Sequence, residues 1–262
     1  MSRRFALALA GVASVATIVA APATANHSWG GYHWARTANP FTIKLGDNLT
    51  TAEWKGDLAT ASSDWSVDSR FNNPLNTTIV PGQSVNKRCK PTSGRVEVCN
   101  GNYGFNGWLG LAQIWLSGGH IVQGVSKMND SYFNTSTYNI PTEKLHVMCQ
   151  EVGHTFGLGH QDESGASLNT CMDYYHNADA NDTLSTHPND HDYEELAIIY
   201  AHLDSTTTIG AASAHGLATS EDARAERTER TDRITDSTIV ETFADGSQRI
   251  THIFWAIPGA VR

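Results

Sequence analysis

The spacing of apolar and polar residues predicts four short strands in the first half of the chain. Residues 41–45 alternate as Phe-Thr-Ile-Lys-Leu, the period of two that is typical of a half-buried strand. Residues 95–99 form a second candidate strand. Two longer apolar runs, 108–116 and 120–128, are separated by Ser-Gly-Gly, so we expect them to pair as a hairpin or as neighbouring strands.

Three segments carry the start or stop residues of helices. Thr-Thr-Ala-Glu at 50–53 matches a capping box and predicts a helix that runs to about Trp65. A second helix begins at Pro141, and Gly157 is placed to end it. A third helix begins near Asn189 and has its apolar side chains on one face.

The end of the chain differs from the presumed main domain, residues 26–203. Residues 204–236 lack a sustained apolar stripe, which predicts a polar linker or a solvated helix. Residues 237–262 contain two apolar runs around an Asp-Gly pair, a strong indication of a β-hairpin. Because an isolated hairpin is marginally stable in water, we expect this appendage to dock on the main domain.

Charge and the first residues indicate an exported protein. The chain of 262 residues carries 18 Lys and Arg against 27 Asp and Glu, a formal net charge of −9, which argues against a nucleic-acid binder. Residues 1–25 have the anatomy of a secretory signal peptide, with two arginines, an apolar centre and an Ala-Thr-Ala cleavage site. No run of about 20 apolar residues follows. We therefore expect a secreted protein without a membrane span, and a monomer by default.

Four cysteines are available, and export makes disulfides permissible. Cys89 and Cys99 bracket a Pro-Thr-Ser-Gly turn, so a local bridge is the simplest pairing, and Cys149 and Cys171 then form the second. The sequence alone does not prove this connectivity. A zinc site built from all four cysteines is the alternative, although the C-x-x-C spacing that such sites usually have is absent.

Residues 149–160 carry the most chemical information, with the sequence Cys-Gln-Glu-Val-Gly-His-Thr-Phe-Gly-Leu-Gly-His. On a helix, Gln150 and His154 lie one turn apart on the same face, so their side chains can converge on one ion. Glu151 lies beside that face, within reach of a metal-bound water. Gly157 permits a sharp turn that returns His160 as a further ligand.

This stretch resembles the metzincin zinc-protease motif H-E-x-x-H-x-x-G-x-x-H at every defining position but one, because Gln150 stands in place of the first histidine. Cys-Met-Asp-Tyr at 171–174 is similar to the methionine turn of that family, with Met172 beneath the metal and the Met-x-Tyr spacing of astacins and serralysins. The resemblance covers about residues 41–203 and is nearest to the matrixin branch. In that family, the strand that corresponds to 108–116 is an edge strand that pairs with an extended peptide substrate.

The resemblance implies an α+β zincin domain with a twisted mixed sheet, an active-site helix, a methionine turn and a C-terminal helix. It also implies a secreted zinc-dependent endopeptidase that acts on proteins or peptides. Zinc is then held by His154 and His160 with Gln150 as third ligand, Glu151 is the general base, and Tyr174 supports the developing oxyanion.

Gln150 leaves three interpretations open. Its amide oxygen can bind zinc and, like neutral imidazole, adds no charge, although it is a weaker ligand. Alternatively, another group completes the site. Asp162 is better placed for this than His146, which is two helical turns from His154. Finally, the protein is a pseudoprotease that binds peptides or proteins in the same cleft, and the retention of Glu151 argues against that interpretation.

Two further features follow from the same region. A bridge between Cys149 and Cys171 would clamp the active-site helix to the methionine turn. Residues 176–183 offer oxygen ligands that suit a structural calcium ion, and a polar turn explains them equally well.

Overall fold

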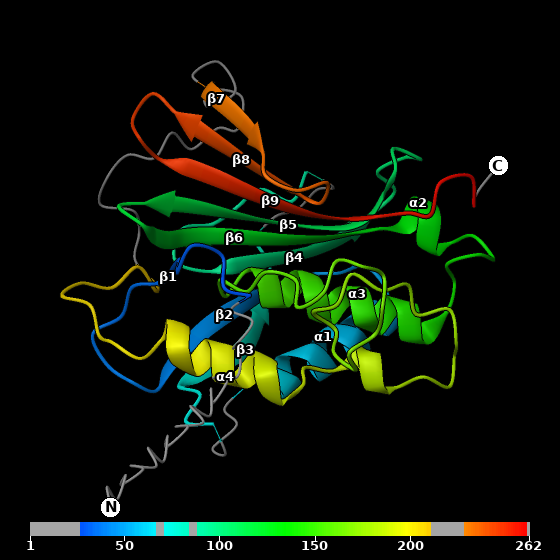
Figure 1. The fold of residues 1–262 in the computed structure, drawn as a ribbon, viewed down its shortest axis with the longest axis horizontal. Helices are drawn as coiled ribbons and strands as arrows, with labels where there is room; N and C mark the ends of the chain where they lie inside the picture. The colour runs from blue at the N-terminus through cyan, green and yellow to red at the C-terminus, as the bar shows by residue number, and fades with distance from the viewer. Residues whose placement is uncertain (1–26, 67–70, 84–87, 211–227, 261–262) are drawn as a thin grey trace, which may run out of the picture.

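One mixed β-sheet with helices on one of its faces forms the core of the protein, an α+β fold (Figure 1). The computed structural model describes residues 27–66, 71–83, 88–210 and 228–260. The signal peptide predicted at 1–25 lies outside the described residues. No helix in the described part is long and apolar enough to cross a membrane.

The sheet has the strand order β3-β2-β4-β6-β5-β9-β8-β7, with β1 as an additional partner of β6. The strands β3, β2, β4 and β6 are parallel, whereas β5, β9, β8 and β7 each run antiparallel to the strand before them in this order. Their bounds in chain order are β1 His33–Trp34, β2 Phe41–Asn48, β3 Leu75–Pro81, β4 Val96–Gly101, β5 Trp108–Ser117, β6 His120–Asn129, β7 Thr228–Arg233, β8 Thr238–Phe243 and β9 Gln248–Trp255.

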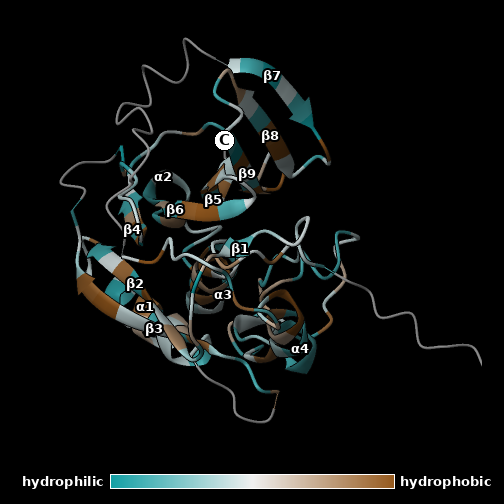
Figure 2. Ribbon diagram, turned by 90° about the vertical axis from the view of Figure 1, so that its left-hand side faces the viewer, coloured by the Kyte–Doolittle hydropathy of each residue, from teal (hydrophilic) through white to brown (hydrophobic). Residues whose placement is uncertain are grey.

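The longer helices α1, α3 and α4 lie on one side of the sheet, and the short α2 lies at the end of β6, as Figures 1 and 2 show. Helix α3 packs directly against β5 and β6, and α1 packs against α3 and β3. The bounds are α1 Ala52–Asp64, α2 Asp130–Phe133, α3 Pro141–His154 and α4 Asp190–Ile199, with a short 3-10 helix η1 at Leu184–Thr186. The main hydrophobic core fills the space between the sheet and these helices.

The predicted strands at 41–45, 95–99, 108–116 and 120–128 are present as β2, β4, β5 and β6. Three strands were not predicted. β1 has only two residues, too few to show an alternating pattern. β3 is rich in threonine and ends in proline, so it lacks an apolar alternation. β7 reads Thr-Glu-Arg-Thr-Asp-Arg and belongs to the stretch for which we predicted a linker or a solvated helix. It forms because its backbone pairs with β8 at the end of the sheet, where charged side chains remain in water.

The predicted helices are also present, with a shift of one residue at the start of α1. Thr51, and not Thr50, caps this helix, because its side-chain oxygen accepts a hydrogen bond from the backbone N–H of Trp54 at 3.2 Å. Helix α4 begins after Asn189, which forms a reciprocal capping box with Asp192.

The C-terminal hairpin, β8 and β9, docks on the main sheet through β9. This strand pairs with β5 from Trp108 opposite Trp255 to Leu116 opposite Gln248. In Figure 1 the hairpin continues the sheet beyond β5. The expectation that β5 is an edge strand is therefore wrong, because both of its sides are paired within the chain.

Both predicted disulfides are present. Cys89 is joined to Cys99, and Cys149 is joined to Cys171. The first bridge packs with Trp115 and Val125 in a small apolar cluster separate from the main core. The second lies in the main core and joins α3 to the segment that follows His160.

Candidate active site on helix α3

The C-terminal half of α3 carries the motif into the core. Pro141 occupies the first turn, where its missing N–H costs no hydrogen bond, and the helix ends at His154. Gly157 then adopts a φ of +102°, and a Cβ at this position would lie 2.1 Å from the carbonyl oxygen of Tyr32. Only glycine meets both conditions, so this residue produces the turn that brings His160 back to His154.

His154 and His160 face each other through their Nε2 atoms, 3.1 Å apart. The Nδ1 of His154 donates to the carbonyl oxygen of Leu158 at 2.8 Å, and the Nδ1 of His160 donates to Oε1 of Glu163 at 2.9 Å. Because each Nδ1 carries the ring proton in its hydrogen bond, each Nε2 has a free lone pair that points toward the other histidine. Zinc-bound histidines have this arrangement. Two tetrahedral ligands at zinc–nitrogen distances of about 2.0–2.1 Å are roughly 3.3 Å apart, so the pair fits one zinc ion.

The His154 imidazole is held in its neutral form. Burial lowers its pKa well below the usual value, and the neighbouring His252 and His160 lower the pKa further. A neutral imidazole is the form that binds metal.

Gln150 is anchored through its nitrogen. The Nε2 donates to the main-chain oxygens of Cys171 at 2.9 Å and Asp173 at 2.7 Å, while the buried Oε1 has no hydrogen-bond partner among the described residues. A buried amide oxygen without a partner is costly. The side chain therefore has a free oxygen that can serve as a metal ligand.

Glu151 is completely buried, and neither of its carboxylate oxygens has a hydrogen-bond partner among the described residues. Burial raises the pKa of this carboxyl well above its usual range. The helix approaches β5 so closely here that a Cβ at Gly110 would lie 2.7 Å from Oε1 of Glu151. A buried carboxyl with free oxygens on a metal-ligand helix is a candidate general base.

The predicted methionine turn lies against the same helix. Met172 is fully buried, and its Sδ would lie 2.6 Å from a Cβ placed on Gly153, the residue before His154. The ring of Tyr174 lies edge-on to that of His160, with centroids 5.3 Å apart. Burial raises the pKa of Tyr174 to about 12, so its phenol stays protonated and can donate a hydrogen bond.

The alternative ligands are not gathered at this site. Asp162 uses its Oδ1 to accept hydrogen bonds from the backbone N–H of Ser164 at 2.8 Å and from its hydroxyl at 2.5 Å. His146 is buried, and its Nδ1 lies 2.6 Å from the carbonyl oxygen of Ser185. In the stretch 176–183 predicted to suit calcium, the acidic side chains accept backbone hydrogen bonds within turns.

Sequence reasoning missed the contribution of the hairpin to this site. His252 in β9 stacks on His154, with ring centroids 4.1 Å apart and planes within 7°, and its Nε2 is buried without a partner among the described residues. Phe254 packs against Tyr174 at 5.0 Å. Alternation along β9 puts Ile250, His252 and Phe254 on one face, so the pattern could have indicated that this face is buried, but not on what.

The hairpin encloses the site. The backbone N–H of Trp255 donates to the Tyr174 hydroxyl at 2.9 Å, and the Ser237 hydroxyl donates to Glu163 at 2.9 Å. A pocket of about 640 Å³ remains at the outer margin, lined in part by Glu163, Tyr174 and Trp255. The histidines and Glu151 themselves are covered.

Comparison with known proteins adds no assignment. The sequence matches no protein-family model and no curated protein.

Proposed function

We propose that this protein is a secreted, metzincin-like, zinc-dependent endopeptidase. One observation carries the proposal: His154 and His160 present inward Nε2 atoms 3.1 Å apart, each backed by a hydrogen bond at Nδ1. The same helix provides three buried side-chain oxygens without a hydrogen-bond partner among the described residues, one from Gln150 and two from Glu151. The donor set suits zinc, and the carboxyl suits proton transfer.

In this proposal His154, His160 and the Oε1 of Gln150 hold the ion. Zinc, when bound, supplies Lewis acidity that polarises the scissile carbonyl and lowers the pKa of a water molecule. Glu151 accepts a proton from the attacking water and passes it to the nitrogen of the departing amine. Tyr174 donates its phenolic hydrogen to the oxygen on which negative charge develops.

The Gln150 ligand keeps the site at the charge of a three-histidine site, because an amide and an imidazole are both neutral. It is the weaker donor, so zinc is held less tightly. Two features of the chain offset this weakness. The amide is pre-oriented by its hydrogen bonds to the main-chain oxygens of Cys171 and Asp173, and the Cys149–Cys171 bridge fixes that segment to the helix.

With the hairpin docked, the proposed enzyme is in a latent form, because the hairpin blocks access of a substrate to the site. β9 pairs along β5, the strand that an extended peptide would use in a metzincin-like enzyme, and its Trp255 N–H occupies the Tyr174 hydroxyl. A polypeptide substrate reaches Glu151 only after this hairpin moves away. The proposal therefore includes a release step before catalysis.

Zinc content and hydrolysis, measured together, test the proposal. Wild type is compared with Gln150→His for zinc per chain by elemental analysis, and with Glu151→Gln for cleavage of an unfolded protein. The hydrolysis assay is repeated in the Phe254→Ala background, which loosens the hairpin. We expect the wild type to hold about one zinc per chain more than His160→Ala, which lacks a cleft ligand, and cleavage that a chelator and Glu151→Gln both abolish.

The pseudoprotease interpretation predicts a different result. A cleft without zinc in wild type, beside a loaded Gln150→His variant and no cleavage in either hairpin background, would contradict the endopeptidase proposal. Peptide binding without turnover would then be the function to measure. Cleavage that survives both the chelator and Glu151→Gln would also contradict it.

A further inference from the structure

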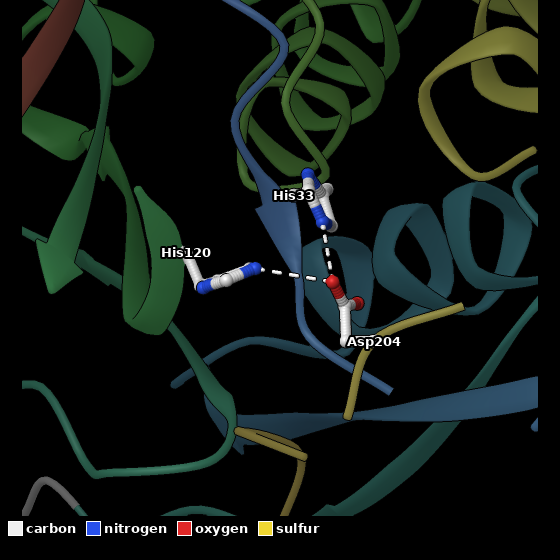
Figure 3. A group of neighbouring side chains, drawn as sticks. All are labelled: His33, His120 and Asp204. Carbon is white, nitrogen blue, oxygen red and sulfur yellow. Dashed lines mark hydrogen bonds and ion pairs between the residues drawn. The ribbon is translucent and has the colours of Figure 1, made fainter. Parts of the chain in front are cut away.

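Three segments that are far apart in sequence meet at the start of β6. His33 lies in β1, directly opposite His120 in the parallel pairing of β1 with β6. His202 and Asp204 come from the segment that follows α4. Figure 3 shows the side chains of His33 and His120 converging on Asp204 from two sides.

Short distances join Asp204 to three histidines in this cluster. The ligand atoms of His33, His120 and Asp204 all lie within 4.8 Å of one another. The Oδ1 of Asp204 is 3.4 Å from Nε2 of His33, 3.2 Å from Nε2 of His120 and 3.6 Å from Nε2 of His202. The Nε2 atoms of His33 and His202 are 3.1 Å apart. Ligands of a tetrahedral zinc are separated by roughly 3.3 Å.

Hydrogen bonds on the far side of His33 and Asp204 orient their ligand atoms toward the cluster. The Nδ1 of His33 lies 2.8 Å from the carbonyl oxygen of Gly31, which assigns its proton to Nδ1 and leaves the Nε2 lone pair for the cluster. The Oδ2 of Asp204 accepts hydrogen bonds from the backbone N–H of Arg36 at 3.1 Å and from its Nη1 at 3.3 Å. The other oxygen, Oδ1, is thereby turned toward the histidines.

A purely hydrogen-bonded cluster is the competing explanation, and it accounts for fewer of these contacts. His202 can donate to Nε2 of His33 at 3.1 Å, and His120 can donate to Oδ1 of Asp204 at 3.2 Å. With its proton on Nδ1, however, a neutral His33 has no hydrogen to donate to Asp204, although its Nε2 lies 3.4 Å from that carboxylate. A cation bound between the four groups explains all of the short contacts at once.

We propose that His33, His120 and Asp204, with His202 as fourth ligand, form a structural zinc site. Three imidazoles and one carboxylate are a donor set that favours zinc over calcium or magnesium. With four protein ligands no position is left open for substrate, so the role is structural. This site shares no residue with the cleft on α3, and the inference does not depend on the proposed peptidase activity.

The consequence of binding is a clamp on the N-terminal segment. β1 and the residues before it support the turn that carries His160, since the N–H of Trp29 donates to the carbonyl oxygen of Gly157 at 3.0 Å. The Nε1 of Trp34 donates to the carbonyl oxygen of Thr155 at 2.9 Å. An ion at His33 would hold this segment to β6 and to the residues after α4.

The test uses the full chain without a histidine tag, depleted of metal and then titrated with zinc. His120→Ala and His202→Ala are combined, because their side chains are 31% and 56% exposed and their removal leaves the core intact. His187→Ala is the control, since this exposed histidine pairs with Asp64 outside the cluster. Stoichiometry is read by calorimetry, and the melting temperature is measured with and without zinc.

We expect the double variant to bind about one zinc fewer per chain than wild type and His187→Ala. Without metal, its melting temperature should equal that of the wild type. Zinc should raise the melting temperature of the double variant by less than it raises that of the wild type. Repeating the titration in a His160→Ala background removes the cleft ion, so that the remaining zinc reports on this cluster alone. Equal stoichiometry and equal melting shifts in wild type and double variant would overturn the proposal in favour of a hydrogen-bonded cluster only.

Discussion

The imidazole of His252, from the C-terminal hairpin, lies flat against that of His154, with ring centroids 4.1 Å apart. A residue 98 positions later in the chain thus covers the motif histidine on which the proposed metal chemistry depends. The covering strand is held by its pairing with β5 and by Phe254, which is fully buried. Opening of the hairpin is therefore the event on which access to the site depends.

Weakening the hairpin should activate the protein. Truncation of a buried phenylalanine costs about 3–5 kcal/mol, and Phe254→Ala places that loss where the hairpin contacts Tyr174. If about 3 kcal/mol of this loss comes from weaker docking of the hairpin on β5, the fraction of molecules with an undocked hairpin rises about 100-fold. We expect at least tenfold faster cleavage of an unfolded protein substrate.

Phe41→Ala is the matched control for that experiment, because Phe41 is a buried residue of β2, on the opposite side of the sheet order from the hairpin. It should lower stability to a similar degree without raising the rate. Equal rates in wild type and Phe254→Ala, or the same rise in Phe41→Ala, would contradict the latent arrangement.

Gln150→His should tighten zinc binding and weaken the metal-free fold. An imidazole nitrogen binds zinc more strongly than an amide oxygen. The substitution also removes the donor to the main-chain oxygens of Cys171 and Asp173. The oxygen of Asp173 keeps the backbone N–H of Tyr175 at 2.9 Å, whereas that of Cys171 loses its donor, at a cost of about 1–3 kcal/mol. Denaturant unfolding with and without zinc should show a lower metal-free stability and a larger gain on zinc addition than in wild type. A metal-free stability equal to that of the wild type would contradict this account.

Removal of the Cys149–Cys171 bridge should affect the site, whereas removal of Cys89–Cys99 should not. The sequence separations are 22 and 10, so loop-closure entropy assigns each bridge a similar stabilisation of about 3 kcal/mol. Only the first anchors the segment that holds Gln150. We expect similar losses in the free energy of unfolding for the two double Cys→Ala variants, but weaker zinc binding in the first alone. Equal zinc affinities would argue against a role of the bridge in the site.

Gly157→Ala should be strongly destabilising. A non-glycine residue at its φ of +102° is strained by about 1–2 kcal/mol, and the clash with the Tyr32 carbonyl adds about 1–3 kcal/mol. Gly104 has a φ of +94°, and a Cβ added there would meet no atom within 4 Å, so Gly104→Ala isolates the strain alone. Chemical denaturation should give a loss of about 3 kcal/mol for Gly157→Ala and about 1 kcal/mol for Gly104→Ala. Equal losses in the free energy of unfolding for the two variants would mean that the backbone at Tyr32 can move away from an added Cβ.

Asp57 should make the fold less stable as the pH rises. Burial, together with the nearby Glu53, raises the pKa of this carboxyl to about 7, against an ordinary value near 4. Between these two values the folded state holds a proton that the unfolded state has lost, so stability falls from about pH 4 to pH 7. We expect Asp57→Asn to flatten this dependence and to stabilise the protein at pH 8 by about 2 kcal/mol, allowing for solvent screening. Parallel stability curves for the two proteins would contradict the assignment to Asp57.

Much of the local structure followed from short stretches of sequence. Alternation predicted β2, two apolar runs around Ser-Gly-Gly predicted the β5–β6 pair, and Pro141 with Gly157 bounded helix α3 and the turn after it. The placement of Gln150, Glu151, His154 and His160 along one helix and one turn is local for the same reason. Each of these features depends on residues within about twenty positions of one another, where backbone geometry and side-chain periodicity decide the outcome.

What only the tertiary structure decided is which distant segments meet. The sequence predicted a docked hairpin but not that β9 pairs with β5, nor that His252 covers His154. β7 has no apolar pattern and forms through backbone pairing with β8. His33, His120 and Asp204 are scattered over the chain and became neighbours because β1 pairs with β6 and the segment after α4 returns to both. Such contacts depend on the packing of the whole sheet, for which no local pattern carries the information.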